Sequence, residues 1–399
     1  MEMHEKILHM PPAEMTSISY DCPCGKHHAI NIGELLVGRG VRREIARLAR
    51  PYRENRGRIM IVADCHTWEV LGKEVEQMLR DDMPDAPVVS CVFPDHHLIP
   101  NAKTLGTLLI EASETPLSLM IAVGSGTIND STRFISNRLG IPYIVMGTAP
   151  SMDGYAGDNV PLVCRGTKIT FYAHYARAVV LDTEILATAP QIMVCAGFGD
   201  VIGKYIALSD WKLAHQTKGE YYCPHIAALM ENAVKKCVES IDLVVARDPD
   251  AMQSLAETLC LAGMAMGLSS VTRPASGTEH QMTHWFDVDK IKNDRDYPLH
   301  GNTVGVCTIV MARFYEMAIA DGYVDIVPPG AAEIRALLAK LGAPLHPREL
   351  DIDRETFRRC LLEAKDLRPR YSILKFACEH GFLDTYVERI TAEFYDSRV

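Results

Sequence analysis

Short apolar runs alternate with amphipathic segments through the first half of the chain. Four runs are predicted to be buried strands, namely Arg58–Ala63, Val88–Phe93, Leu117–Val123 and Pro142–Met146. Helical spacing predicts helices between them, over Trp68–Leu79, Ala102–Ala112 and Ile128–Leu139. This alternation is typical of a parallel sheet that helices cover on both faces. Two further strands are predicted later, over Thr167–Tyr172 and Ala178–Leu181.

The pattern changes near residue 190, where strand signals fade and long helical spacings take over. Helices are predicted over Val201–His215, Pro224–Glu239, Pro249–Ser269, Gly301–Ala320, Ala331–Leu341, Arg354–Ala364 and Ile373–His380. We therefore expect an α/β protein with a Rossmann-like parallel-sheet domain over residues 1–189 and an all-α domain over 190–399. Residues 1–28 are expected to be irregular, and residues 29–56 to contain one short basic helix, Arg42–Arg50.

The composition and charge of the chain argue against several classes of protein. The chain has 399 residues and a formal net charge of -10 without a long basic run, which argues against a nucleic-acid partner. No stretch approaches the ~20 apolar residues of a membrane span, and the charged start of the chain does not resemble a secretory signal. The 12 cysteines are scattered, as is typical of reduced thiols in a cytoplasmic protein.

A glycine-containing turn, Gly124-Ser125-Gly126, joins an apolar strand to a helix start. Glycines let a diphosphate approach the backbone, and the amides at a helix N-terminus favour an anion. The next predicted strand ends at Thr148-Ala-Pro-Ser151, so two strand ends would form a crevice for a dinucleotide. Asp64 ends an earlier strand, where it could bind ribose hydroxyls or cap the following helix.

The helical half contains candidate metal ligands. His280 and His284 lie one helical turn apart, His300 opens the run His-Gly-Asn-Thr-Val-Gly, and Asp200 stands alone upstream. Three such ligands with one exchangeable position are typical of a catalytic metal, although spacing alone does not choose between His280 and His284. The metalloprotease pattern His-Glu-x-x-His fails because position 281 is Gln.

A second candidate is the segment Cys22-Pro-Cys24-Gly-Lys-His27-His28, which supplies two thiols and up to two imidazoles. The segment lacks a second cysteine pair, and a tight turn explains its proline and glycine. We therefore interpret it as a structural turn rather than as a functional metal site.

Five motifs follow one another along the chain. The first two are Gly124-Ser-Gly-Thr-Ile-Asn-Asp130 and Thr148-Ala-Pro-Ser-Met-Asp-Gly154. Gly197-Phe-Gly-Asp-Val201, Gly277-Thr-Glu-His280 and His300-Gly-Asn-Thr-Val-Gly305 follow. As a set they closely resemble the sn-glycerol-1-phosphate dehydrogenases, in particular the bacterial AraM-like branch. The resemblance covers roughly residues 30–390 and implies the fold shared by dehydroquinate synthases and iron-dependent alcohol dehydrogenases.

The resemblance also implies a role for individual residues. Asp200, His280 and His300 would hold a divalent metal, Zn or Ni. His284 and Asp153 would contact the substrate and act in catalysis, and Asp200 would also border the substrate. The dinucleotide would be lined by Asp64, Gly124, Ser125, Gly126, Thr127, Ile128, Thr148, Ser151 and Gly157. Gly157 departs from the family, which is expected to have a serine there, and Asn302 stands where relatives often carry an acid or another polar residue.

The implied reaction is the reversible reduction of dihydroxyacetone phosphate to sn-glycerol 1-phosphate by NAD(P)H, with NADH favoured because Asp64 would repel a 2′-phosphate. Lys204 is the candidate partner for the substrate phosphate. A homodimer or higher homo-oligomer is expected. Alternatives are a glycerol or other polyol or alcohol dehydrogenase of the same fold, a dehydroquinate synthase, and a protein that binds nucleotide or metal without catalysis.

Overall fold

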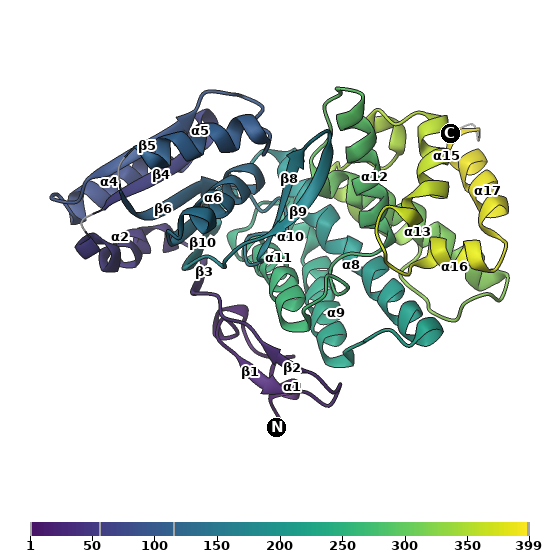
Figure 1. Ribbon diagram of the computed structural model, residues 1–399. Helices are drawn as coiled ribbons and strands as arrows, with labels where there is room; N and C mark the ends of the chain where they lie inside the picture. Colours follow the sequence, from purple (N-terminus) through teal and green to yellow (C-terminus); the bar gives the residue numbers. More distant parts are fainter. Residues whose placement is uncertain (1, 56, 115, 397–399) are drawn as a thin grey trace.

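The N-terminal half of the protein is built on a six-stranded sheet. A computed structural model describes residues 2–55, 57–114 and 116–396 (Figure 1). The sheet has the order β3-β10-β7-β6-β4-β5, and every neighbouring pair is parallel. In chain order its strands are β3 (Glu34–Gly38), β4 (Arg58–Asp64), β5 (Val88–Phe93), β6 (Leu117–Gly124), β7 (Tyr143–Gly147) and β10 (Ala178–Asp182).

Helices cover both faces of this sheet, as the alternation predicts. Alternate β4 side chains belong to two different apolar clusters, Ile59 and Ile61 on one face and Met60 and Val62 on the other. The first face packs against α2 and α4, and the second against α5 and α6. The helices of this half are α2 (Ile45–Ala49), α3 (Cys65–Thr67), α4 (Lys73–Asp82), α5 (Ala102–Ser113), α6 (Gly126–Leu139) and α7 (Thr183–Leu186).

The strand order reverses at β4. The chain runs from β4 to its neighbour β5 and then returns to β6 on the opposite side of β4. In open α/β sheets, ligands bind outside the carboxyl ends of the strands at such a reversal. Asp64 and Gly124 are the last residues of β4 and β6, so both lie where a ligand is expected.

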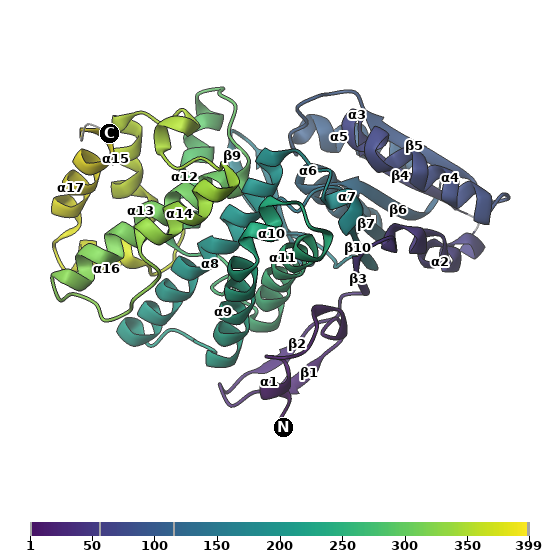
Figure 2. The same cartoon turned by 180° about the vertical axis from the view of Figure 1, so that it is seen from behind.

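The described residues after 190 form an all-α half, which confirms the predicted fold class (Figures 1 and 2). Its helices are α8 (Gln191–Lys218), α9 (Pro224–Glu239), α10 (Ile241–Val245), α11 (Pro249–Ser269), α12 (Thr278–Lys292), α13 (His300–Ala320), α14 (Ala331–Leu341), α15 (Arg354–Glu363), α16 (Ile373–Glu379) and α17 (Leu383–Tyr395). Helices α8 and α13 are long and apolar enough to cross a membrane, but 78% of each apolar window is buried inside the protein. They are core helices.

The N-terminal segment differs from the irregular structure that we expected. It forms the short helix α1 (Met3–Lys6) and an antiparallel hairpin of β1 (Ser19–Asp21) and β2 (His27–Ala29). The hairpin lies beside α9 and α11 rather than beside the six-stranded sheet (Figures 1 and 2). Three-residue strands are too short to give a periodic signal, so the sequence pattern did not reveal them.

Two other strands were missed. The edge strand β3 is only partly buried, which weakens its apolar pattern, and β8 (Asn159–Cys164) contains Pro161. Strand β8 pairs with β9 (Thr167–Tyr172) in a hairpin that contacts α6 on one side and α12 on the other. The exact domain boundary at residue 189 stays a prediction.

Candidate functional site

Two helices cross closely enough for their backbones to touch. A Cβ atom on Gly301 of α13 would lie 1.8 Å from the Ala196 carbonyl oxygen, and one on Gly199 of α8 would lie 2.2 Å from the Gly301 carbonyl oxygen. Only glycine fits at these two positions. The glycines of both motifs therefore allow a close helix crossing, which brings Asp200 on α8 near His300 on α13.

A buried carboxylate fixes the start of α12. The backbone N–H and the hydroxyl of Thr278 both donate to Asp210 Oδ2, at 2.7 and 2.5 Å. The hydroxyl of Tyr315 donates to the other oxygen of Asp210 at 2.7 Å. These bonds satisfy free donors of the first helical turn and set the position of His280 two residues later.

Asp200, His280 and His300 converge from three helices. One ligand atom from each lies within 4.8 Å of the others, so the three residues could hold one metal ion. His280 Nε2 is 3.4 Å from Asp200 Oδ1. His284 instead groups with Asp287 and His300, and its ring centre is 6.4 Å from that of His280. The geometry thus groups His280, rather than His284, with Asp200.

Glu279 orients His280. Its Oε1 lies 2.6 Å from His280 Nδ1 and also accepts the backbone N–H of Gly277 at 2.8 Å. With its Nδ1 proton held by Glu279, His280 would offer the Nε2 lone pair to a metal ion beside Asp200, which is the arrangement found for metal-bound histidines. Sequence reasoning missed this role, because a glutamate directly before a histidine forms no distinctive pattern by itself.

Lys204 is fully buried and holds two carboxylates together. Its Nζ lies 2.6 Å from Asp200 Oδ1 and 2.7 Å from Asp153 Oδ2. Burial alone would raise the pKa of Asp200, but Lys204 and His280 outweigh it and keep that pKa well below its usual range. Since both carboxylates already engage Lys204, the structure argues against our expectation that this lysine binds a substrate phosphate.

Asp153 lies beside this group, and its contact with the substrate stays a prediction. Its backbone N–H donates to Asp200 Oδ2 at 3.1 Å. Burial and the neighbouring Asp200 raise the pKa of Asp153. The loop that carries it is held by the buried Arg133, whose guanidinium donates to the carbonyls of Gly154 and Tyr155 at 2.6 and 2.9 Å. Sequence reasoning missed Arg133.

The donor set fits a divalent metal. Among the described residues, the buried Nδ1 atoms of His284 and His300 have no hydrogen-bond partner. Burial lowers the pKa of both imidazoles, with help from Lys168, so both are neutral near pH 7. A neutral imidazole is the form that binds a metal or accepts a proton. Buried nitrogens without partners are rare in proteins unless a ligand uses them.

Two basic groups lie near His284. Lys168 on β9 pairs with Asp287 of α12 at 2.9 Å, and both are largely buried. The guanidinium of Arg368 donates to Thr170 at 3.3 Å, and its charge helps to lower the pKa of His284. No sequence signal connects these residues, because Lys168 and Arg368 are 200 positions apart.

The turn between β6 and α6 joins a strand end to a helix start, which is the place where a phosphate group can bind. A Cβ atom on Gly124 would lie 2.7 Å from the Cβ of Ile128, so this glycine is needed for packing. At Gly126 a Cβ atom would lie 3.8 Å from Met152 Cγ, which is an ordinary contact distance, so packing does not require this second glycine. The backbone of Thr148 donates to the Gly124 carbonyl at 3.3 Å and ties the adjacent strand end to this turn.

Other predicted cofactor residues border the same region. Ser125 is the N-cap of α6, Thr127 and Ile128 lie in its first turn, and Ser151 is buried beyond β7. Asp64 caps α3, since its Oδ1 accepts the backbone N–H groups of His66 and Thr67 at 2.9 and 2.8 Å. Helix capping thus accounts for one carboxylate oxygen, and the ribose contact stays a prediction.

Gly157 is buried beside Gly263 of α11. A Cβ atom there would meet its nearest neighbours at 3.9 Å, which is an ordinary contact distance. The expected serine would therefore fit, and its absence is not a steric requirement. The contact of Gly157 with a cofactor stays a prediction.

Comparisons with known proteins agree with this architecture. The sequence model of the iron-containing alcohol dehydrogenase family matches residues 36–190. The chain is 33% identical over 406 residues to a glycerol-1-phosphate dehydrogenase (NAD(P)+) of Geobacillus stearothermophilus, covering 93% of this chain and 98% of that protein. It is also 33% identical over 343 residues to the Methanosarcina mazei protein of the same name, covering 86% and 90%.

Solved structures share the fold. Sulfoacetaldehyde reductase from Bifidobacterium kashiwanohense, solved in complex with NAD+, aligns with a TM-score of 0.67 at 18% identity over 90% of this chain and 97% of that one. Glycerol dehydrogenase from Schizosaccharomyces pombe aligns with a TM-score of 0.66 at 15% identity, over 91% and 92%. The fold is that of the iron-containing alcohol dehydrogenases. Within it, the chain belongs to the glycerol-1-phosphate dehydrogenase family, as the five motifs predict.

Proposed function

We propose that this protein catalyses the reversible reduction of dihydroxyacetone phosphate by NAD(P)H to sn-glycerol 1-phosphate. Family membership confirms the predicted class, an NAD(P)-dependent oxidoreductase with a small-molecule substrate. The observation that carries the proposal is the convergence of Asp200, His280 and His300 within 4.8 Å of one another.

These three residues are the proposed metal ligands. A carboxylate and two imidazoles suit Zn or Ni and leave an exchangeable position for substrate. When bound, the metal supplies Lewis acidity and the nicotinamide supplies hydride. Lys204 supports the ligand set, because it keeps Asp200 ionised and fixes the distance between Asp200 and Asp153.

His284 and Asp153 are the proposed groups for proton transfer at the C2 oxygen of the substrate. The pKa of His284 is lowered, so near neutral pH its imidazole is ready to accept the C2 hydroxyl proton during oxidation. The same group returns the proton during reduction. Asp153 has a raised pKa and lies on the other side of Asp200, where it can relay a proton through hydroxyls or water.

Arg368 replaces Lys204 as the proposed partner of the substrate phosphate, and Lys168, which is already paired with Asp287, adds positive charge nearby. Both lie near His284, and Arg368 has no carboxylate among its hydrogen-bond partners in the described part of the chain. A guanidinium suits a phosphate because it presents paired donors.

The proposed dinucleotide site lies at the start of α6, where the amides of Gly126, Thr127 and Ile128 in the first helical turn suit a diphosphate. Asp64, Ser125, Thr148, Ser151 and Gly157 would line the rest of that site. A preference for NADH rests on Asp64, whose carboxylate would repel a 2′-phosphate. We also propose a cytoplasmic location, consistent with 12 free cysteines, and a homodimer or larger homo-oligomer.

One assay tests the reaction directly. Oxidation of NADH and of NADPH is followed with dihydroxyacetone phosphate and with free dihydroxyacetone, on protein of defined metal content, with chiral analysis of the product. We expect a strong preference for the phosphorylated substrate and a single product, sn-glycerol 1-phosphate. Equal turnover of both substrates would instead indicate a polyol dehydrogenase.

Substitutions test the ligands. His280→Ala and His300→Ala are expected to lose the bound metal and to lower kcat/KM by on the order of 1,000-fold, since a Lewis acid contributes several kcal/mol. His284→Ala is expected to keep the metal and to slow reduction. Retained metal and normal activity in His280→Ala or His300→Ala would exclude the proposed ligand set.

A further inference from the structure

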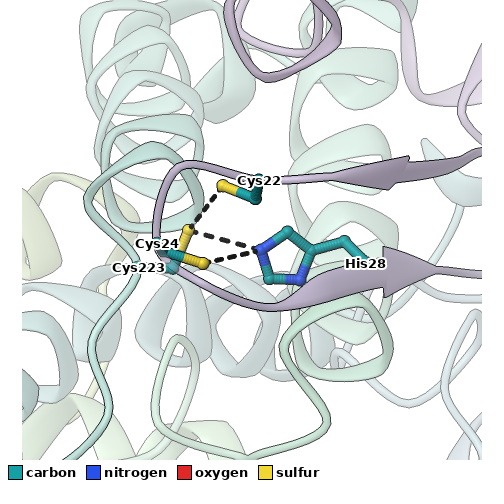
Figure 3. A group of neighbouring side chains, drawn as sticks. All are labelled: Cys22, Cys24, His28 and Cys223. Atoms are coloured by element: carbon teal, nitrogen blue, oxygen red, sulfur yellow. Dashed lines mark hydrogen bonds between the residues drawn. The ribbon is translucent and has the colours of Figure 1, made fainter.

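Four metal-binding side chains meet far from the central site. Cys22, Cys24 and His28 come from the β1–β2 hairpin, and Cys223 immediately precedes α9. In Figure 3 the four side chains point toward one another across the contact between the hairpin and the helical half. The sequence interpretation of this segment as a tight turn was incomplete, because Cys223 lies about 200 residues away along the chain.

Their spacing matches a tetrahedral ion. Cys22 Sγ lies 3.8 Å from Cys223 Sγ, and His28 Nε2 lies 3.3 Å from Cys24 Sγ and 3.5 Å from Cys223 Sγ. All four donor atoms lie within 4.8 Å of one another. Tetrahedral zinc with ordinary bond lengths separates two sulfurs by about 3.8 Å and a sulfur from a nitrogen by about 3.5 Å.

The histidine is oriented as a metal ligand. Its Nδ1 donates to the carbonyl of Leu268 in α11 at 2.7 Å, which places the proton on Nδ1 and leaves the Nε2 lone pair facing the thiols. Metal-bound histidines are commonly held by such a bond to a backbone carbonyl. His28 and Cys223 are completely buried, Cys22 is 7% exposed and Cys24 is partly buried, so three of the four side chains are shielded from solvent.

The hairpin turn brings the thiols of Cys22 and Cys24 close together. Gly25 donates its N–H to the Cys22 carbonyl at 2.9 Å, and Cys22 donates to the Lys26 carbonyl at 3.0 Å. Gly25 has a φ of +86°, which other residues rarely adopt. The turn places Cys24 beside Cys22, and the alternation of β2 turns His28 inward while His27 faces solvent.

We propose that Cys22, Cys24, His28 and Cys223 form a second, structural metal site that binds one divalent ion of the zinc type. Three thiolates and one imidazole complete a tetrahedron and leave no open position, which distinguishes a structural site from a catalytic one. The ion fastens the N-terminal hairpin to the helical half at the start of α9. The hydroxyl of Tyr221, 3.6 Å from Cys24 Sγ, supports one thiolate from outside the ligand set.

Metal stoichiometry tests the site. Protein purified with zinc is analysed for metal per chain as wild type, Cys24→Ser, Cys223→Ser and His300→Ala. We expect two ions in the wild type, one in each of the three variants, and none when Cys223→Ser is combined with His300→Ala. His27→Ala is the matched control, because His27 neighbours His28 but points outward, and it is expected to keep both ions.

Cobalt separates the two sites in the unmodified protein. Replacement of zinc by Co²⁺ should give intense thiolate-to-cobalt absorption that disappears in Cys24→Ser and persists in His300→Ala, since the central site has no sulfur donor. Limited proteolysis should cut the N-terminal segment faster in Cys24→Ser than in His27→Ala.

Three results would overturn the proposal. One is a wild-type chain that binds no metal ion. Another is cobalt absorption without a thiolate band in the wild type. The last is a count of ten rather than 12 free thiols after denaturation, which would indicate a disulfide in place of the site. Each of these results is measured on wild-type protein, so the test does not depend on whether the variants fold.

Discussion

The central cluster and the N-terminal cluster both bring metal-binding side chains together, but they differ in the number and type of their donor atoms. Asp200, His280 and His300 come from three long helices and provide three donors, surrounded by further charged groups such as Lys204 and Glu279. The N-terminal cluster provides four donors, three of them sulfurs, from a hairpin and a helix start. Three donors leave a position for substrate, whereas four close the shell. The number of donors thus separates the proposed catalytic site from the proposed structural one.

The supports of the two clusters differ as well. The central ligands are placed by a helix crossing in which backbones touch at Gly199 and Gly301. The N-terminal ligands are placed by a turn of a few residues and one carbonyl of α11. A rigid support positions groups for chemistry to within fractions of an ångström, and a local turn is sufficient to hold a structural ion.

The largest effect is expected from Gly301→Ala, which disrupts the crossing of α8 and α13 and leaves the N-terminal cluster unchanged. The new Cβ would lie 1.8 Å from the Ala196 carbonyl oxygen, so α8 and α13 must separate. We expect kcat/KM to fall by on the order of 100-fold or more, because misplacement by about 1 Å has that effect. The central metal should be lost while the N-terminal cluster keeps its cobalt thiolate band.

Gly106→Ala is the matched control, since a Cβ there meets nothing within 4 Å in α5. It is expected to leave activity unchanged and to raise stability slightly. Equal activity of the two variants would show that the crossing does not position the central site.

Arg368→Met should weaken recognition of the phosphate without changing either metal. A hydrogen bond to a charged group contributes about 1.5–3 kcal/mol, so KM for dihydroxyacetone phosphate is expected to rise by roughly 10- to 100-fold. KM for free dihydroxyacetone should not change. Arg389→Met, at an exposed position in α17, serves as the control. An unchanged KM for the phosphorylated substrate would remove Arg368 from the site.

Glu279→Gln should weaken metal binding at the central site and leave the N-terminal cluster unchanged. Glu279 orients His280 from a distance of 2.6 Å, and loss of such a partner typically lowers metal affinity or activity by about 10- to 100-fold. Competition with a chelator, read as metal retained per chain, measures the change. Glu355→Gln, an exposed substitution in α15, controls for the lost charge. Identical chelator curves for the two variants would contradict the assigned role.

The smallest expected effect is a change with pH in the folding stability of the protein, caused by Asp130 in the sheet half. Burial raises the pKa of Asp130 in α6 to about 7. Between pH 6 and 8 the folded protein therefore binds more protons at this carboxyl than the unfolded chain, so folding stability falls as pH rises. Asp130→Asn removes this titration, and its advantage over wild type should grow by about 1 kcal/mol across that range. Thermal unfolding of both proteins at pH 6, 7 and 8 measures this difference in stability. A difference that stays constant with pH would contradict the prediction.

The sequence predicts the sheet better than the sites. Buried strands such as β4 and β6 have continuous apolar runs, because both faces are covered. The edge strand β3 and the proline-containing β8 lack that signal. Asp200, His280 and His300 stand in motifs that could be recognised as a set, although spacing alone did not choose between His280 and His284. Lys168, Arg368 and Cys223 could not, since their importance depends on neighbours that only folding brings close.

Helix α8 connects the two clusters through a fixed length of chain. Asp200 lies within it, and Cys223 follows shortly after its end at Lys218. Adding one residue between these points would turn everything downstream by about 100° and advance it by 1.5 Å. Within positions 201–218, therefore, no residue can be gained or lost without moving one of the two ligand sets out of its position.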